Sequence, residues 1–265
     1  MHPGRIVDVP GPGEHPAGTG PDLPVLAGHV VLLLVEMPSP VGLPVDCNHV
    51  RADSPIEVSG DHTDPVRNAY AASVDSLLTT AARIGADRWS RPATGEWTVL
   101  DLFAHTVRGM AVIAAFLDAD LPRPEVVLPD AAAYFRAALG VEGAHAGIAA
   151  RAVDTAGTLG PDPLAWAGEV AAASLERVAA TPDDRVVVHV VGALRFADYL
   201  GTRVTELVLH TLNLQLACGM DLSVPTDAVA LVDRILLDLA DRADPVGLAL
   251  ALSGRSGPRG ANVLG

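Results

Sequence analysis

The chain has 265 residues, of which 49% are hydrophobic, and a formal net charge of −14. This composition excludes a fibrous protein and is sufficient for one or two domains with a full core. Because the acidic excess leaves no basic face, it argues against a nucleic acid or an anionic membrane surface as the partner. All 18 basic residues are arginine, which excludes chemistry that needs a Schiff-base lysine or a phosphate-loop lysine.

The cysteine content and the first apolar run favour a cytoplasmic protein. Cys47 and Cys218 are the only cysteines, so neither a disulfide framework nor a four-cysteine metal site is available. The apolar run from Val25 to Val35 is too short to span a bilayer. It is also a poor signal peptide, because a single arginine and several acidic residues precede it.

Residues 1–64 differ from the rest of the chain in pattern. Proline and glycine recur every few positions, and no helical period persists. We therefore predict a disordered leader over 1–64, which a start codon assigned too far upstream would also produce, and a helical domain over 65–265.

From Pro65 onward the apolar residues follow helical spacing. Thr98 is a suitable N-cap for a helix in which Asp101 lies in the first turn. One β-branched run, 185–191, predicts a short strand or extended segment. We predict a mainly α fold with four helices long enough to form a bundle. The expected helices cover residues 66–84, 99–117, 130–139 with a continuation over 144–156, 163–179, a stretch from about 195 that Gly219 closes, and 226–243.

Three side chains in this pattern suggest a metal site. Glu206 and His210 are four residues apart in an apolar helix, so they share one face and can bind one ion. His105 on a facing helix would complete a set of two nitrogens and one oxygen, with an open position for water or substrate, as in catalytic zinc sites. Chance spacing, a hydrogen-bonded core histidine, or an ion pair of Glu206 with Arg203 would explain the same residues without a metal.

Two motifs resemble a known family. The segments Gly95 to His105 (GEWTVLDLFAH) and Asp198 to Leu214 (DYLGTRVTELVLHTLNL) are similar to the metal-binding domain of mycothiol-dependent maleylpyruvate isomerases, within the wider DinB-like superfamily. The resemblance covers about residues 66–265. It implies a DinB-like up-and-down four-helix bundle. It also implies that His105, Glu206 and His210 bind a divalent metal, usually zinc.

The resemblance further implies a reaction that depends on a small thiol such as mycothiol. A metal-bound thiol is deprotonated at neutral pH and can attack a small electrophile, giving isomerisation or transfer. Family members often carry an acidic residue where this chain has Asn213, and the separate carboxy-terminal domain of the best-known isomerases is not expected here. A non-catalytic metal-binding sensor or regulatory module is therefore the alternative, and a bundle that keeps the ligands but stays empty is a third.

Other polar residues have alternative roles. Arg203 is a candidate catalytic and cofactor-binding residue, which would hold the thiol or a substrate carboxylate, and Trp97 is a candidate cofactor-binding residue or a core side chain. His189 is expected to be a hydrogen-bonded strand residue, and Cys218 a small buried hydrophobe. Asp101 would stabilise the helix start or orient His105. The partners expected are a thiol and an electrophile, with the chain as a monomer or homodimer.

Overall fold

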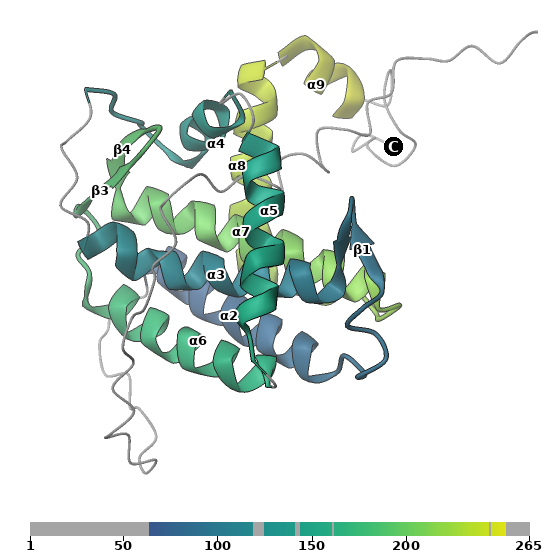
Figure 1. Cartoon of the computed structure of the whole chain (residues 1–265). Helices are drawn as coiled ribbons and strands as arrows, with labels where there is room; N and C mark the ends of the chain where they lie inside the picture. Colours follow the sequence, from purple (N-terminus) through teal and green to yellow (C-terminus); the bar gives the residue numbers. More distant parts are fainter. Residues whose placement is uncertain (1–63, 119–124, 141–143, 161, 244, 253–265) are drawn as a thin grey trace, which may run out of the picture.

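A computed structural model of the chain shows a mainly helical protein (Figure 1). The structure describes residues 64–118, 125–140, 144–160, 162–243 and 245–252. The predicted leader lies outside these residues, except for Asp64. The mainly α prediction is confirmed. The helices in chain order are α2 (Pro65–Ala82), α3 (Val99–Asp118), α4 (Ala131–Leu139), α5 (Ala144–Thr158), α6 (Pro163–Ala180), α7 (Phe196–Ala217), α8 (Thr226–Ala243) and α9 (Pro245–Leu252).

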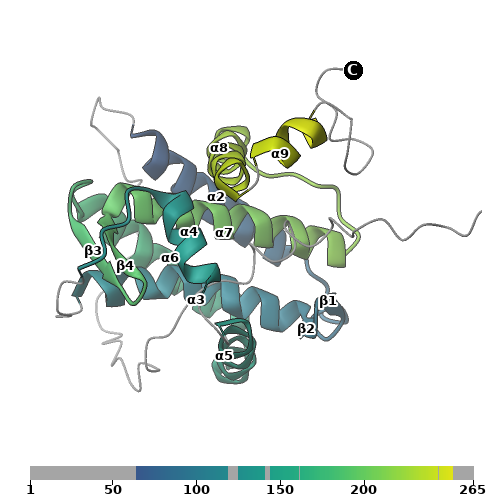
Figure 2. The same ribbon diagram turned by 90° about the horizontal axis from the view of Figure 1, so that it is seen from above.

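Four long helices form the bundle. Helix α2 packs on α7 and α6, and α3 packs on the same two helices, so the four contacts close a ring. Helix α5 crosses α3 on the outside, and α4 and α8 cover α7 (Figures 1 and 2). Each bundle helix contributes fully buried apolar side chains to one continuous core, among them Leu77, Leu102, Ala171 and Leu200. Burial of the apolar face of each helix in this core stabilises the helix more than the intrinsic helix propensity of its residues does.

Helix α2 begins where the sequence pattern changes. Asp64 is its N-cap, and the carboxylate accepts a hydrogen bond from the backbone N–H of Val66 at 2.9 Å. Pro65 occupies the first helical position, where a missing N–H costs nothing. These two residues explain a helix start within one residue of the predicted one.

The extended structure differs from the prediction of one short strand. The run after Arg185 forms β3 (Val186–His189), which pairs antiparallel with β4 (Gly192–Arg195). A second hairpin, β1 (Pro92–Thr94) with β2 (Trp97–Thr98), precedes α3. The strand predicted within 185–191 is therefore present as β3, whereas β1, β2 and β4 were not predicted, because strands of two to four residues are too short to show a period of two. Helix α9 was also not predicted.

One described helix, α3, is long and apolar enough to cross a membrane by length and composition. In this fold α3 packs on α5, α6 and α7. Its apolar side chains Leu102, Phe103 and Ile113 are fully buried. Its hydrophobicity is therefore that of a core helix.

Candidate metal centre

The start of α3 fixes the direction from which His105 enters the core. Gly95 has φ +55°, a conformation that favours glycine, and it turns the chain between β1 and β2. The Asp101 carboxylate accepts hydrogen bonds from the backbone N–H of Thr98 at 2.9 Å and from its hydroxyl at 2.6 Å. The Thr98 hydroxyl in turn accepts from the Asp101 N–H at 3.2 Å. This reciprocal cap fixes the first turn of α3, and His105 lies one turn further on.

Trp97 is the first residue of β2, two residues before α3 begins, and its side chain covers His105. Its side chain is buried, and its ring centroid is 4.8 Å from that of His105 at an interplanar angle of 40°. The tilted indole packs against the imidazole and restricts its range of orientations. The sequence allowed Trp97 to be a core residue or a cofactor contact, and the structure shows it buried against His105.

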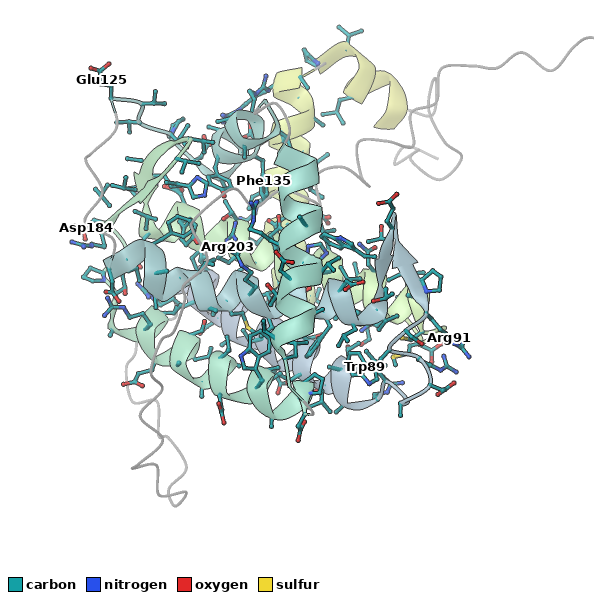
Figure 3. The ribbon with its side chains drawn as sticks, viewed as in Figure 1. Trp89, Arg91, Glu125, Phe135, Asp184 and Arg203 are labelled. Atoms are coloured by element: carbon teal, nitrogen blue, oxygen red, sulfur yellow. The ribbon has the colours of Figure 1, made fainter. Side chains whose placement is uncertain are left out.

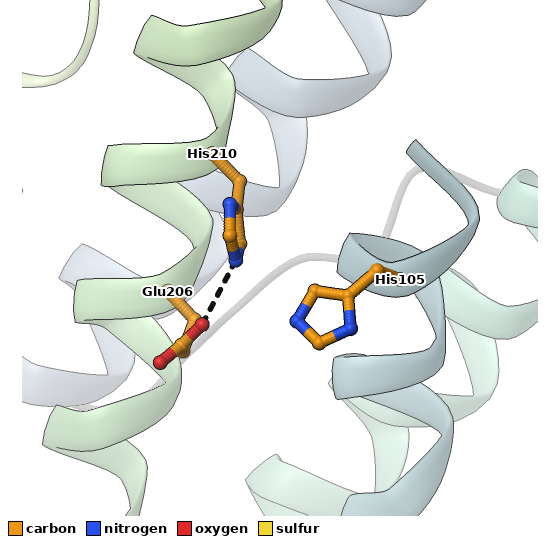
Figure 4. A group of neighbouring side chains, drawn as sticks. All are labelled: His105, Glu206 and His210. Atoms are coloured by element: carbon orange, nitrogen blue, oxygen red, sulfur yellow. Dashed lines mark hydrogen bonds and ion pairs between the residues drawn. The ribbon is translucent and has the colours of Figure 1, made fainter. Parts of the chain in front are cut away.

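Helix α7 supplies the other two candidate ligands. Glu206 and His210 occupy one face, four residues apart, and their side chains are 4% and 0% exposed. The His210 Nε2 atom lies 2.9 Å from the Glu206 Oε2 atom (Figure 4). The His105 and His210 ring centroids are 5.0 Å apart and nearly perpendicular. The structure therefore brings together the three side chains that the sequence selected.

The three side chains form a cluster that fits a divalent cation. Each offers one ligand atom, and these atoms all lie within 4.8 Å of one another. His105 Nε2, Glu206 Oε1 and His210 Nδ1 are buried without a hydrogen-bond partner. Two imidazoles and one carboxylate match the donor set of open zinc sites, in which ligand atoms lie about 3.4 Å apart, so modest side-chain rotation would close the site. Buried polar atoms normally have partners, and a cation would provide one for this set.

Electrostatics around His105 favour the neutral imidazole. Burial lowers its pKa well below the usual value, and His210, Arg108, Arg203 and Arg151 lower it further. A neutral imidazole keeps the lone pair that a metal requires.

Arg203 does not form the ion pair with Glu206 that the sequence allowed. No ion pair joins these two described residues, and the Arg203 Nε–H donates instead to the Thr202 hydroxyl at 3.0 Å. The guanidinium carbon lies 5.0 Å from the ring centroid of Tyr199 and 5.9 Å from that of Tyr134. Figure 3 shows Arg203 in the interior of the molecule, near the middle of the view. The structural ion-pair interpretation was therefore wrong.

The other polar residues that the sequence analysis considered lie away from the cluster's three candidate ligands or have packing and capping contacts. His189 is buried in β3 between the rings of Phe116 and Tyr134, and its Nε2 atom is 3.4 Å from the Tyr134 hydroxyl. Cys218 is 1% exposed at the end of α7, and burial raises the pKa of its thiol. Asp101 serves the helix start, as its bonds to Thr98 show. Asn213 is half-buried on α7.

Two residues near the cluster were missed by the sequence analysis. Arg108 lies three residues after His105, on the same face of α3, and Tyr199 lies four residues before Arg203 on α7. Spacings of three and four residues place side chains on one helical face, so the sequence pattern could have identified both residues. By contrast, a pocket of about 380 Å³ among α2, α4, α7 and α8 shares no residue with the cluster.

Comparison with known proteins gives one match. The family model described as the mycothiol maleylpyruvate isomerase N-terminal domain matches residues 70–215. This span covers more than half of the chain and contains His105, Glu206 and His210. No curated protein and no solved structure matches the chain. The chain therefore belongs to the mycothiol maleylpyruvate isomerase N-terminal domain family.

Proposed function

We propose that the protein binds a divalent metal, zinc in the first place, through His105, Glu206 and His210. We further propose that it is a thiol-dependent isomerase or transferase acting on a small electrophile, with mycothiol as the expected thiol. The observation that carries the proposal is the buried cluster, in which each of the three side chains has an unpartnered polar atom. Three protein ligands leave a coordination position for an exogenous group, as catalytic zinc sites do.

The chemistry follows from the donor set. A divalent cation held there would lower the pKa of a coordinated thiol and make the thiolate available at neutral pH. Glu206 would offset part of the positive charge as the anionic ligand, and its Oε2 atom lies 2.9 Å from His210 Nε2 on the same face of α7. Trp97 holds the His105 ring in place and keeps water from that side of the site. Arg203 would bind an anionic part of the substrate or cosubstrate.

Elemental analysis of untagged protein tests metal binding. We expect about one zinc per wild-type chain and its loss in His105→Ala and His210→Ala. Glu176→Gln, on the exposed side of α6, is the matched surface control and keeps the metal. Absence of zinc from the wild type after reconstitution would refute the proposal that the protein binds a metal.

Turnover tests the enzymatic part. Maleylpyruvate with mycothiol tests isomerisation, and 1-chloro-2,4-dinitrobenzene with mycothiol tests transfer. We expect one activity to depend on both zinc and thiol and to disappear in His210→Ala, provided that the variant keeps its circular-dichroism spectrum. Stoichiometric zinc without turnover of either substrate would support the non-catalytic metal-binding module instead.

The setting expected for this function is the cytoplasm, with small molecules as partners. The acidic net charge of −14 disfavours nucleic acids and anionic membranes as partners. Light scattering would distinguish a monomer from a homodimer.

A further inference from the structure

The pocket of about 380 Å³ among α2, α4, α7 and α8 is separate from the metal cluster. Much of its lining is small, because Ala131 and Ala132 begin α4, and Ala197 and Gly201 lie in the first two turns of α7. A Cβ at Gly201 would lie 3.5 Å from Ile235 Cδ1 and 3.8 Å from Ala131 Cβ, so α4 and α8 converge on α7 here. The small residues leave an apolar hollow between these helices, with a volume at the lower end of the range for ligand pockets.

The charged residues that line this pocket are mostly acidic. Asp130, Asp198 and Asp238 are half-buried in the lining, and Arg234 is exposed at its edge. Each of the three aspartates has one arginine partner outside the lining. An ionised carboxylate has about four acceptor positions, so these pairs leave room for a further donor. The pocket therefore fits an occupant that combines apolar side chains with positive charge.

The segment 253–265, which lies outside the described residues, has this composition. It contains Arg255 and Arg259, no acidic residue, and the adjacent apolar residues Val263 and Leu264. The segment 1–63 is the other long stretch outside the described residues, and it carries eight acidic residues and two arginines. Its negative charge disfavours it beside three aspartates. Charge complementarity therefore selects 253–265, although the chain as a whole has a net charge of −14.

The segment is also long enough to reach the pocket. It follows α9, which packs on α8 and is separated from it by one residue (Figures 1 and 2). Ile235 lies eight residues before the end of α8, and α9 has eight residues, so at most about 30 Å separates Leu252 from Ile235. Val263 is eleven residues beyond Leu252 and can lie up to about 36–40 Å from it. A tether of this length gives a roughly millimolar effective concentration at the pocket.

We infer that residues 253–265 fold back onto this pocket of the same chain. Val263 and Leu264 would enter the hollow lined by the alanines and Gly201, and the two arginines would lie beside the aspartates. The docked segment would hold α8 against α4 and α7. The inference depends neither on a metal nor on the reaction, because the pocket and the metal cluster have no residue in common.

Paramagnetic relaxation enhancement on the full chain tests the docking. A nitroxide is attached to Arg234→Cys at the edge of the pocket, in a Cys47→Ser background in which the remaining Cys218 is buried. We expect the label to broaden the amide signals of Val263 and Leu264 most strongly. Leu264→Asp should reduce the enhancement at the Val263 amide by at least about twofold, because loss of one buried leucine weakens docking by about tenfold or more.

A second variant and a matched control separate docking from the mere proximity of a tethered segment. Leu231→Asp changes the half-buried wall of the pocket and should give the same reduction as Leu264→Asp. Val246→Asp makes the same kind of change at a side chain of α9 that is 68% exposed, and it should leave the enhancement unchanged. An equal enhancement in Leu264→Asp and Val246→Asp would overturn the inference.

Two further outcomes would identify a different occupant and also overturn the inference. Broadening of the amides of 25–35 in place of those of 261–264 would assign the pocket to the segment before α2. A sample that mixes nitroxide-labelled chains with isotope-labelled chains lacking the nitroxide tests a second copy. Broadening of Val263 and Leu264 in that mixture, equal to that within one chain, would show that the segment docks on a neighbouring molecule. We expect no broadening in the mixture.

Discussion

Replacing Glu206 by glutamine separates metal binding from the stability of the bundle. The carboxylate is buried, with Oε2 at 2.9 Å from His210 Nε2 and Oε1 without a partner. A glutamine carbonyl keeps the side-chain shape and can accept the same hydrogen bond, but it removes the anionic ligand. We therefore expect the unfolding free energy in EDTA to change by less than about 2 kcal/mol, the scale of one hydrogen bond.

The same substitution should remove most of the stabilisation by zinc. At a free zinc concentration one hundred times Kd, a single native-state site stabilises the wild type by about 2.7 kcal/mol. For a folded region of this size, that corresponds to a rise in Tm of about 5–11 °C. Differential scanning calorimetry with and without zinc measures the rise directly.

Glu206→Gln should show almost no rise at that zinc concentration, whereas the surface control Glu176→Gln should show the full one. A Glu206→Gln protein that retains the wild-type rise would refute the assignment of Glu206 as a ligand. A large loss of stability already in EDTA would instead show that the carboxylate is needed by the bundle itself.

Three further predictions concern the stability of the folded protein. In EDTA, His210→Ala should destabilise the protein more than His105→Ala, by about 2 kcal/mol, because it alone removes the partner of a buried carboxylate; urea denaturation would show equal losses if that contact has no role. Gly192→Ala should cost about 2–3 kcal/mol, because Gly192 has φ +146° and an added Cβ would lie 2.8 Å from Leu128 Cγ; an unchanged Tm would contradict this. The pKa of His189 is lowered to about 3 by burial and by Arg203, so between about pH 6.5 and pH 3 the unfolded chain binds a proton that the folded chain does not, and stability falls as the pH falls. By pH 5 the loss of unfolding free energy that His189 causes reaches about 2 kcal/mol at most. His189→Gln should therefore lose less stability than the wild type between pH 7 and pH 5. An identical loss for both proteins in urea titrations would exclude a contribution of His189 to the pH dependence.

Sequence periodicity located the long helices well. The predicted 99–117 and 226–243 segments match α3 and α8 within one residue, because caps and apolar spacing are local signals. The three candidate ligands were also selected from sequence, two of them by their spacing of four residues on one helix. The pattern added His105 from a facing helix, and the resemblance selected the same three residues.

What the sequence did not show depends on contacts between elements. The hairpins β1–β2 and β3–β4 are too short for a periodic signal. Arg203 appeared able to pair with Glu206 because both lie on α7, but its guanidinium turns to the tyrosine rings instead. The approach of Arg108 and Arg203 to one place depends on how α3 packs against α7, which no local pattern records.

The positions of the three candidate ligands along the chain would also make a bound metal a cross-link. Glu206 and His210 are neighbours within one helix, whereas His105 is 101 residues away from Glu206 on α3. Closing a flexible loop of that length costs about 4 kcal/mol of chain entropy. A fluctuating α7 could therefore hold the ion weakly with two ligands, and the third would arrive only when α3 docks. The ion would then act as a chelate that slows separation of the two helices while leaving the early steps of folding almost unchanged.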